Sequence, residues 1–104
     1  MGKSRRQELH SRLTVLIWHL LKWRHQPEKR SVSWDLTIDE QRRAIEYVLE
    51  ESPSLRPTVP KVIVKVYSHA LRGASKETGL PVDAFPAQCP FNADQILDKD
   101  YLPE

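Results

Sequence analysis

Apolar residues recur every three or four positions along several stretches of the chain, a spacing typical of amphipathic helices. The first stretch covers about residues 3–26 and ends before Pro27, because proline lacks an amide donor and disfavours helical geometry in the residue before it. Val15, Trp18 and Leu21 widen its apolar face, which predicts a central helix touched from at least two sides. The main stripe consists of Leu9, Leu13, Leu16, Ile17, Leu20 and Trp23.

The second stretch covers residues 33–52 and ends at Ser52-Pro53. Its N-terminal cap has two candidates. Thr37 is followed three residues later by Glu40 in the order of a capping box, whereas Ser33 would give a longer helix and is favoured here. The apolar stripe consists of Trp34, Ile38, Ile45, Val48 and Leu49, with Gln41 or Arg42 at the position between them.

The third stretch, residues 57–78, contains the β-branched run V-I-V-K-V, which could indicate a strand. Its apolar residues keep a helical spacing over more than four turns, and Gly79-Leu80-Pro81 is a typical helix end, so a helix is predicted. Because proline is tolerated only in the first turn of a helix, Pro57 and Pro60 place the start of this helix at about Pro57 or Thr58. Gly73 is its weak point, costing up to about 1 kcal/mol relative to alanine.

A short fourth helix is predicted over residues 92–99, with Asn92 as its cap and Gln95 three residues inside it. The apolar residues of this tail should hold it against the other helices. They are Phe85, Phe91, Ile96, Leu97, Tyr101 and Leu102. The chain is therefore predicted to be all-α. We expect one domain spanning 1–104, an up-and-down antiparallel bundle of three main helices plus this short one, which a partner could complete to four.

Composition adds little to this picture. The chain has 104 residues, 39% hydrophobic, and a net charge of +2, values typical of one small globular domain. The longest apolar run, residues 13–18, is much shorter than the roughly 20 residues that cross a bilayer, so no membrane association is expected. Cys89 is the single cysteine and cannot form an internal disulfide, which fits a reducing cytoplasm.

The sequence offers no constellation for catalysis or metal binding. The histidines at 10, 19, 25 and 69 include no pair three or four residues apart, and Cys89 has no basic neighbour to stabilise a thiolate. No glycine-rich phosphate loop occurs. We therefore expect no metal, no cofactor and no enzymatic activity. An enzyme that uses His19 or His25 ranks last among the alternatives.

Basic and aromatic residues gather around the corner between the first two helices. The rings could stack on a ligand while the basic groups bind its phosphate. The favoured interpretation is structural, with the rings closing the end of the bundle and the basic stems lying across them. The residues of this basic corner are Lys22, Trp23, Arg24, Lys29, Arg30 and Trp34.

Several motifs occur in order across nearly the whole chain. They are H-L-L-K-W (19–23), Q-P-E-K-R-S-x-S-W (26–34), E-Q-R-R-x-I (40–45), L-E-E-S-P-S-L-R-P (49–57), E-T-G-L-P (77–81) and C-P-F-x-x-x-Q-I-L-D (89–98). With these motifs the chain resembles domain-of-unknown-function family 29, a family of small bacterial proteins. The resemblance implies an up-and-down helical bundle, and it implies no established activity and no catalytic residues.

Members of that family usually carry about one helical hairpin before the segment G-K-S-x-R-R-x-E-L, with which this chain begins. Without such a hairpin, the apolar face around Val15, Trp18 and Leu21 should be open and should bind a second copy or a partner helix. The leading hypothesis is accordingly a non-enzymatic interaction or assembly module.

The alternative hypothesis is a nucleic-acid-associated or antitoxin-like regulatory protein. It depends on the charge distribution: residues 1–30 contain eight Lys or Arg and two Glu, whereas residues 44–104 contain six basic and nine acidic residues. The basic residues concerned are Lys3, Arg5, Arg6, Arg12, Lys22, Arg24, Lys29 and Arg30.

Overall fold

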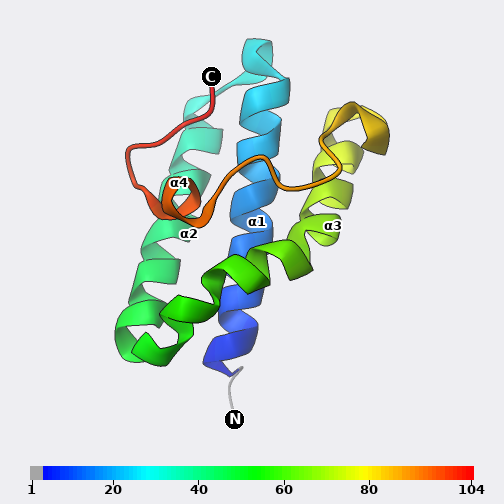
Figure 1. Ribbon diagram of the computed structural model, residues 1–104. Coiled ribbons are helices and arrows are strands. Elements are labelled where there is room, and N and C mark those ends of the chain that lie inside the picture. Colours follow the sequence, from blue (N-terminus) through cyan, green and yellow to red (C-terminus); the bar gives the residue numbers. More distant parts are fainter. Residues whose placement is uncertain (1–3) are drawn as a thin grey trace.

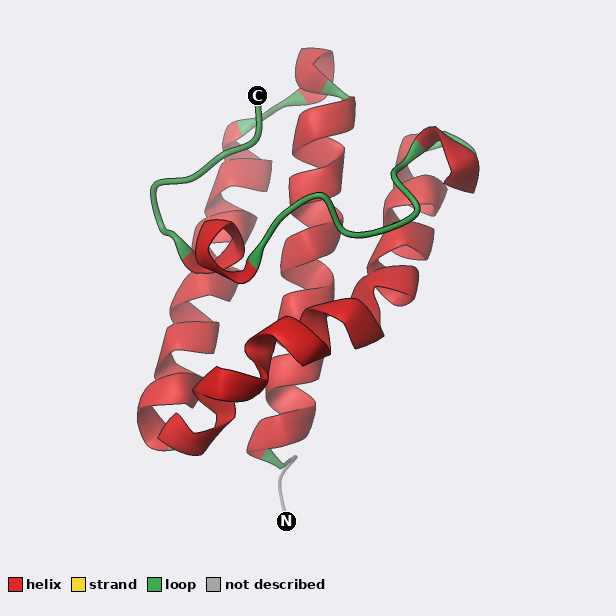
Figure 2. Cartoon of the chain, in the orientation of Figure 1, coloured by secondary structure: helices red, strands yellow, loops and turns green. Residues whose placement is uncertain are grey.

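The computed structural model describes residues 4–104, and this part of the chain contains four α-helices and no strand (Figures 1 and 2). The prediction of an all-α helical bundle is confirmed. The α-helices are α1 (Arg5–His25), α2 (Val32–Glu51), α3 (Val59–Thr78) and the short α4 (Ala93–Leu97). Between them lie the 3₁₀ helices η1 (Pro27–Lys29), η2 (Pro53–Thr58) and η3 (Val82–Ala84).

The central helix is α1, which packs against both α2 and α3. In Figure 1, α2 runs antiparallel beside α1, and α3 crosses obliquely in front of α1. The apolar stripes of the three helices meet in one core, which accounts for the spacing of their apolar residues. Its largest fully buried side chains are Leu9, Leu13, Leu16, Ile17, Leu20, Leu21, Ile38, Ile45, Val48, Leu49, Val59 and Ile96.

Side-chain caps fix where three of the helices begin. Ser4 Oγ accepts a hydrogen bond from Gln7 N at 3.1 Å. Asn92 and Gln95 form the predicted capping box at α4, with each side chain accepting from the other residue's backbone amide. The predicted cap of α2, Ser33, is wrong, because Ser31 is extended and its Oγ accepts from Trp34 N at 3.2 Å.

The tail after α3 folds back over the bundle. It leaves α3 at Gly79, whose φ of 77° suits a residue without a Cβ, and crosses in front of α1 to place α4 beside α2 (Figure 1). Ile96, Phe91 and Phe85 are buried in the core. Buried Arg42 of α2 also holds the tail, donating from Nε to Ile96 O at 2.8 Å.

The predicted open face of α1 is largely covered. Leu21 is 0% exposed, so the prediction that it remains available to a partner is wrong. Val15 and Trp18 are half-buried. At Trp18 the cover is α3, which approaches so closely that Trp18 Cδ2 lies only 2.7 Å from where a Cβ on Gly73 would be. The absent side chain of Gly73 therefore lets α3 close over α1.

Candidate functional site

The basic corner is held together by internal contacts. Lys22 is 6% exposed; its Nζ donates to Glu77 Oε1 at 2.7 Å and lies 4.4 Å from the centre of the Trp34 ring. Arg30 donates from Nε to Trp23 O at 2.8 Å, and its Cζ lies 5.1 Å from the centre of that tryptophan's ring. These contacts favour the structural interpretation of the corner, with basic stems lying against the rings.

Glu77 is the anion on which this arrangement depends. Besides the bond from Lys22, its Oε1 accepts a hydrogen bond from Trp18 Nε1 at 3.0 Å. The hydrogen bond from Lys22 lowers the pKa of Glu77, and its effect exceeds the opposing effect of burial. Glu77 therefore stays ionised and ties α3 to the same face of α1 that was predicted to bind a partner.

The other basic residues near the N-terminus also do not form one free surface. Arg5 pairs with Glu8 and with Glu51, and Arg12 pairs with Glu8 at 3.6 Å. Lys3 lies outside the described residues. Within residues 4–104, Arg6, Arg24 and Lys29 are exposed and form no ion pair. The structure thus disperses the basic cluster that the sequence suggested.

The histidines and Cys89 are not brought together. In the part of the chain that the structure describes, no three His, Cys, Asp or Glu side chains form a group that could hold a metal ion. Burial lowers the pKa of His19 and of His25. His25 packs edge-on against Phe85, with 4.7 Å between the ring centres, and its Nε2 is buried without a hydrogen-bond partner among the described residues.

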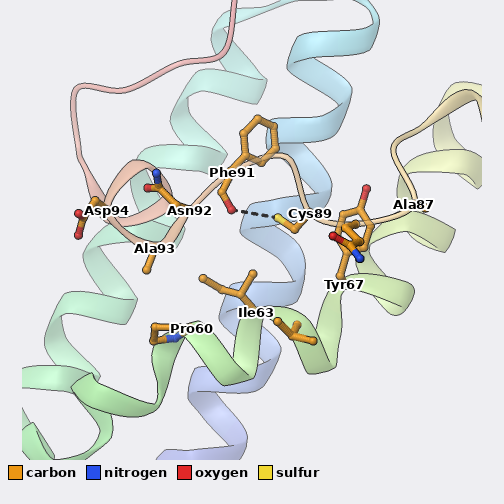
Figure 3. Close-up of a pocket in the computed structure, with 11 residues that line it drawn as sticks. Pro60, Ile63, Tyr67, Ala87, Cys89, Phe91, Asn92, Ala93 and Asp94 are labelled. Carbon is orange, nitrogen blue, oxygen red and sulfur yellow. Dashed lines mark hydrogen bonds between the residues drawn. The ribbon is translucent and has the colours of Figure 1, made fainter.

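A groove of about 770 Å³ lies between α3 and the segment that returns to α4 (Figure 3). Pro60, Ile63 and Tyr67 project from α3 toward this segment, which contributes Cys89 and Phe91 (Figure 3). The groove is thus largely apolar, and part of its wall is the C-P-F motif. The remaining residues that line it are Val64, Ala87, Gln88, Asn92, Ala93 and Asp94.

The titratable side chains in the body of the groove are held in their neutral forms. Burial raises the pKa of Tyr67 to about 12, and its hydroxyl donates to Pro86 O at 2.6 Å. Burial also raises the pKa of Cys89, whose Sγ donates to Phe91 O at 3.4 Å (Figure 3). Neither group is activated as a base or nucleophile. These two side chains therefore bring no charge into the groove at neutral pH.

A second hollow of about 630 Å³ lies between α2 and the end of the tail. Arg42, Arg43 and Lys99 line it together with acidic side chains from both elements, so charges of opposite sign face one another. Buried Arg42 is already bonded to the backbone of Gln95 and Ile96. We assign this hollow a role in holding the tail.

A line of basic side chains lies on α3. It was not predicted, because the predicted basic surface consisted of residues in the N-terminal half. In the sequence, its members follow one another at intervals of four, four, three and four residues, which places them on one side of a helix. The five residues are all exposed and form no ion pair with any residue from 4 to 104. This set, called here the α3 ridge, consists of Lys61, Lys65, His69, Arg72 and Lys76.

The family model described as "Domain of unknown function DUF29" matches residues 1–102. The chain belongs to the DUF29 family. Neither a curated protein nor a solved structure matches it. The family description names no activity that could be transferred to this chain. No helix in residues 4–104 is long and apolar enough to cross a membrane.

Proposed function

We propose that this DUF29 chain is a non-enzymatic protein-interaction module that binds a short amphipathic helix of a partner protein in the groove between α3 and residues 87–94. The observation that carries the proposal is an open, largely apolar groove whose Tyr67 and Cys89 are both held neutral. Apolar grooves of this kind bind the apolar stripe of an amphipathic helix through anchors about one turn apart.

The size of the groove fits a short helix. Its α3 wall runs from Pro60 to Tyr67, a rise of about 10 Å at roughly 1.5 Å per residue. That length accommodates two or three apolar anchors at positions i, i+4 and i+7. Val64 on this wall is 78% exposed, although it is a large apolar side chain at the edge of the groove. A partner helix would cover it.

Charge indicates which flank of the partner faces the tail. Residues 83–104 contain five acidic side chains and one lysine, and Asp94 lies at the α4 end of the groove (Figure 3). Asp94 is exposed and forms no ion pair with residues 4–104. The partner helix should therefore carry Lys or Arg on the flank that faces the tail, since complementary charges set orientation at an interface.

The proposed interaction takes place in the cytoplasm. A thiol kept reduced, as Cys89 would be there, retains the weak hydrogen bond to Phe91 O that holds the groove wall. The groove replaces the face around Val15, Trp18 and Leu21 as the proposed interface, because α3 covers part of that face.

Val64→Asp tests the proposal. The substitution places a charge at the edge of the apolar groove, whereas the side chain is already solvated in the free protein. We expect a helical peptide with leucines at i, i+4 and i+7 and lysines on one flank to lose about tenfold or more in affinity, measured by fluorescence anisotropy. The matched control is Val82→Asp, because Val82 is 51% exposed and lies outside the groove.

Two further measurements decide whether the occupant is a partner helix. A peptide of the same composition with glutamates in place of the lysines should bind more weakly. Equal loss of affinity in Val64→Asp and Val82→Asp would contradict docking in the groove. The second measurement is light scattering on the purified chain. A dimer that Val64→Asp dissociates would mean that a second copy fills the groove, which contradicts the proposal of a distinct partner.

A further inference from the structure

We propose that the α3 ridge is a binding surface for the phosphate backbone of double-stranded nucleic acid. This second surface is independent of the groove and of any partner helix. The observation behind it is a continuous line of exposed basic side chains without an acidic side chain among them. The sequence pointed to nucleic acid through other residues, those of the N-terminal half, of which Arg5, Arg12 and Lys22 are paired with acids in the structure.

The ridge is narrow. At about 100° per residue, its five members fall within a sector of roughly 80° on the helix. The opposite side of α3 is buried in the core, through Ile63, Ala70 and Ala74. From Lys61 to Lys76 the ridge rises about 22 Å, which corresponds to between six and seven base pairs at roughly 3.4 Å each.

The charges of the ridge are available to a ligand. The only acidic residue of α3, Glu77, lies on another side of the helix, where it binds Lys22 and Trp18 of α1. In the N-terminal half, by contrast, Lys22 is buried against Glu77, and Arg5 and Arg12 are paired with acids of α1 and α2. The ridge therefore presents the longest uninterrupted run of positive charge on any described helix.

The composition of the ridge favours phosphate over other anionic partners. Its exposed companion on the same side is Ser68, and it contains no Phe, Tyr, Trp or large aliphatic side chain. Centres of protein interfaces are depleted of charge and rich in such anchors, so an acidic protein fits poorly. Most apolar side chains of α3 are buried in the core, and exposed Val64 belongs to the lining of the groove, so the ridge has no apolar face to insert into a lipid surface. Because the ridge has no Phe, Tyr or Trp ring for bases to stack on, it suits a duplex better than a single strand.

The size of the effect follows from the number of charges. Four Lys or Arg side chains should give a slope of log K against log salt of about −3.6, at roughly −0.9 per neutralised phosphate. A change from 50 to 200 mM salt should then weaken binding by about 10²-fold. Non-specific affinity near 10⁻⁴ to 10⁻⁶ M is the expected range at physiological salt.

The test uses the full chain and a fluorescein-labelled 20-base-pair DNA duplex, with affinity measured by anisotropy across a salt series. Lys65→Glu/Arg72→Glu should lower the affinity at 50 mM salt by at least about tenfold and reduce the salt slope by about 2. The matched control, Lys29→Glu/Arg43→Glu, has the same change in net charge at two exposed residues off the ridge. It should retain most of the affinity and the original slope.

Four outcomes would overturn the assignment. These are no binding of the duplex at low salt, equal loss in the two double variants, tighter binding of poly-glutamate than of the duplex, and tighter binding of the matched single strand. Circular dichroism reports whether each variant remains helical. Lys65→Gln/Arg72→Gln repeats the comparison without introducing repulsion, so the assignment stays testable if charge reversal disturbs the fold.

Discussion

Gly73 in the middle of α3 faces the ring of Trp18 so closely that a side chain would not fit. A Cβ at this position would lie 2.7 Å from Trp18 Cδ2 and 2.8 Å from Trp18 Cε3. Helix propensity alone predicts that Gly73→Ala stabilises the protein by about 1 kcal/mol. Overpacking typically costs about 1–3 kcal/mol. We therefore expect Gly73→Ala to lower the free energy of unfolding by up to about 2 kcal/mol in urea titrations, despite its better propensity.

A double-mutant cycle separates the two effects at this contact. In a Trp18→Leu background the ring is gone, so Gly73→Ala should raise the free energy of unfolding, as propensity predicts. The sign of the substitution thus reverses between the two backgrounds. Stabilisation by Gly73→Ala in the presence of Trp18 would contradict a close contact between Gly73 of α3 and the Trp18 ring of α1.

Among the elements, α4 is held against α2 by buried Arg42 in addition to the buried side chain of Ile96. Arg42 donates from Nε to Ile96 O at 2.8 Å and from Nη2 to Gln95 O at 3.2 Å, at the C-terminal end of a five-residue helix. Such a short helix is unstable alone. Arg42→Met should lower the free energy of unfolding by about 1–3 kcal/mol and speed hydrogen exchange at residues 93–97. Arg43→Met, at the exposed neighbour, should change neither; equal effects would contradict the role of Arg42.

The elements also show what the sequence could and could not predict. Periodicity predicted the bundle because a helix must bury one stripe, and Asn92 with Gln95 predicted a cap because both partners lie within one turn. The choice of Ser33 over Thr37 as the cap of α2 was wrong, since the cap is Ser31, whose extended backbone lets its side chain accept from Trp34 N. The sequence left Gln41 and Arg42 as alternatives for one position in the apolar stripe. It could not predict the bonds of Arg42, because their acceptors lie more than 50 residues away in sequence.

For the whole molecule, tertiary contacts decide which charges remain free. The basic N-terminal half looked like one surface in the sequence, yet Lys22 and Arg5 meet acids 55 and 46 residues away. The α3 ridge keeps its charge because the only acid on that helix is used by α1. Spacing could have revealed the ridge, but only the fold shows that it is unpaired. The groove could not be predicted, since it requires the tail's return path.

Two half-buried histidines make the stability of the whole molecule depend on pH. Burial lowers the pKa of His19, and Lys22 adds to this, although the Val15 carbonyl near Nδ1 and Glu77 oppose it. Burial also lowers the pKa of His25, with a smaller contribution from Arg24. A lowered histidine pKa means that the unfolded chain binds protons more readily than the folded chain. The free energy of unfolding should therefore fall as the pH drops below about 6.5.

Urea titrations at pH 7, 6 and 5 measure this dependence. Each histidine can contribute a slope of at most about 1.4 kcal/mol per pH unit, and His19→Gln/His25→Gln should flatten the profile over this range. Glu77 does not interfere, because its lowered pKa places its loss of stabilisation below the ordinary glutamate value of about 4.3. An unchanged slope in the double variant would mean that other groups take up the protons, and that burial of these two rings does not control acid stability.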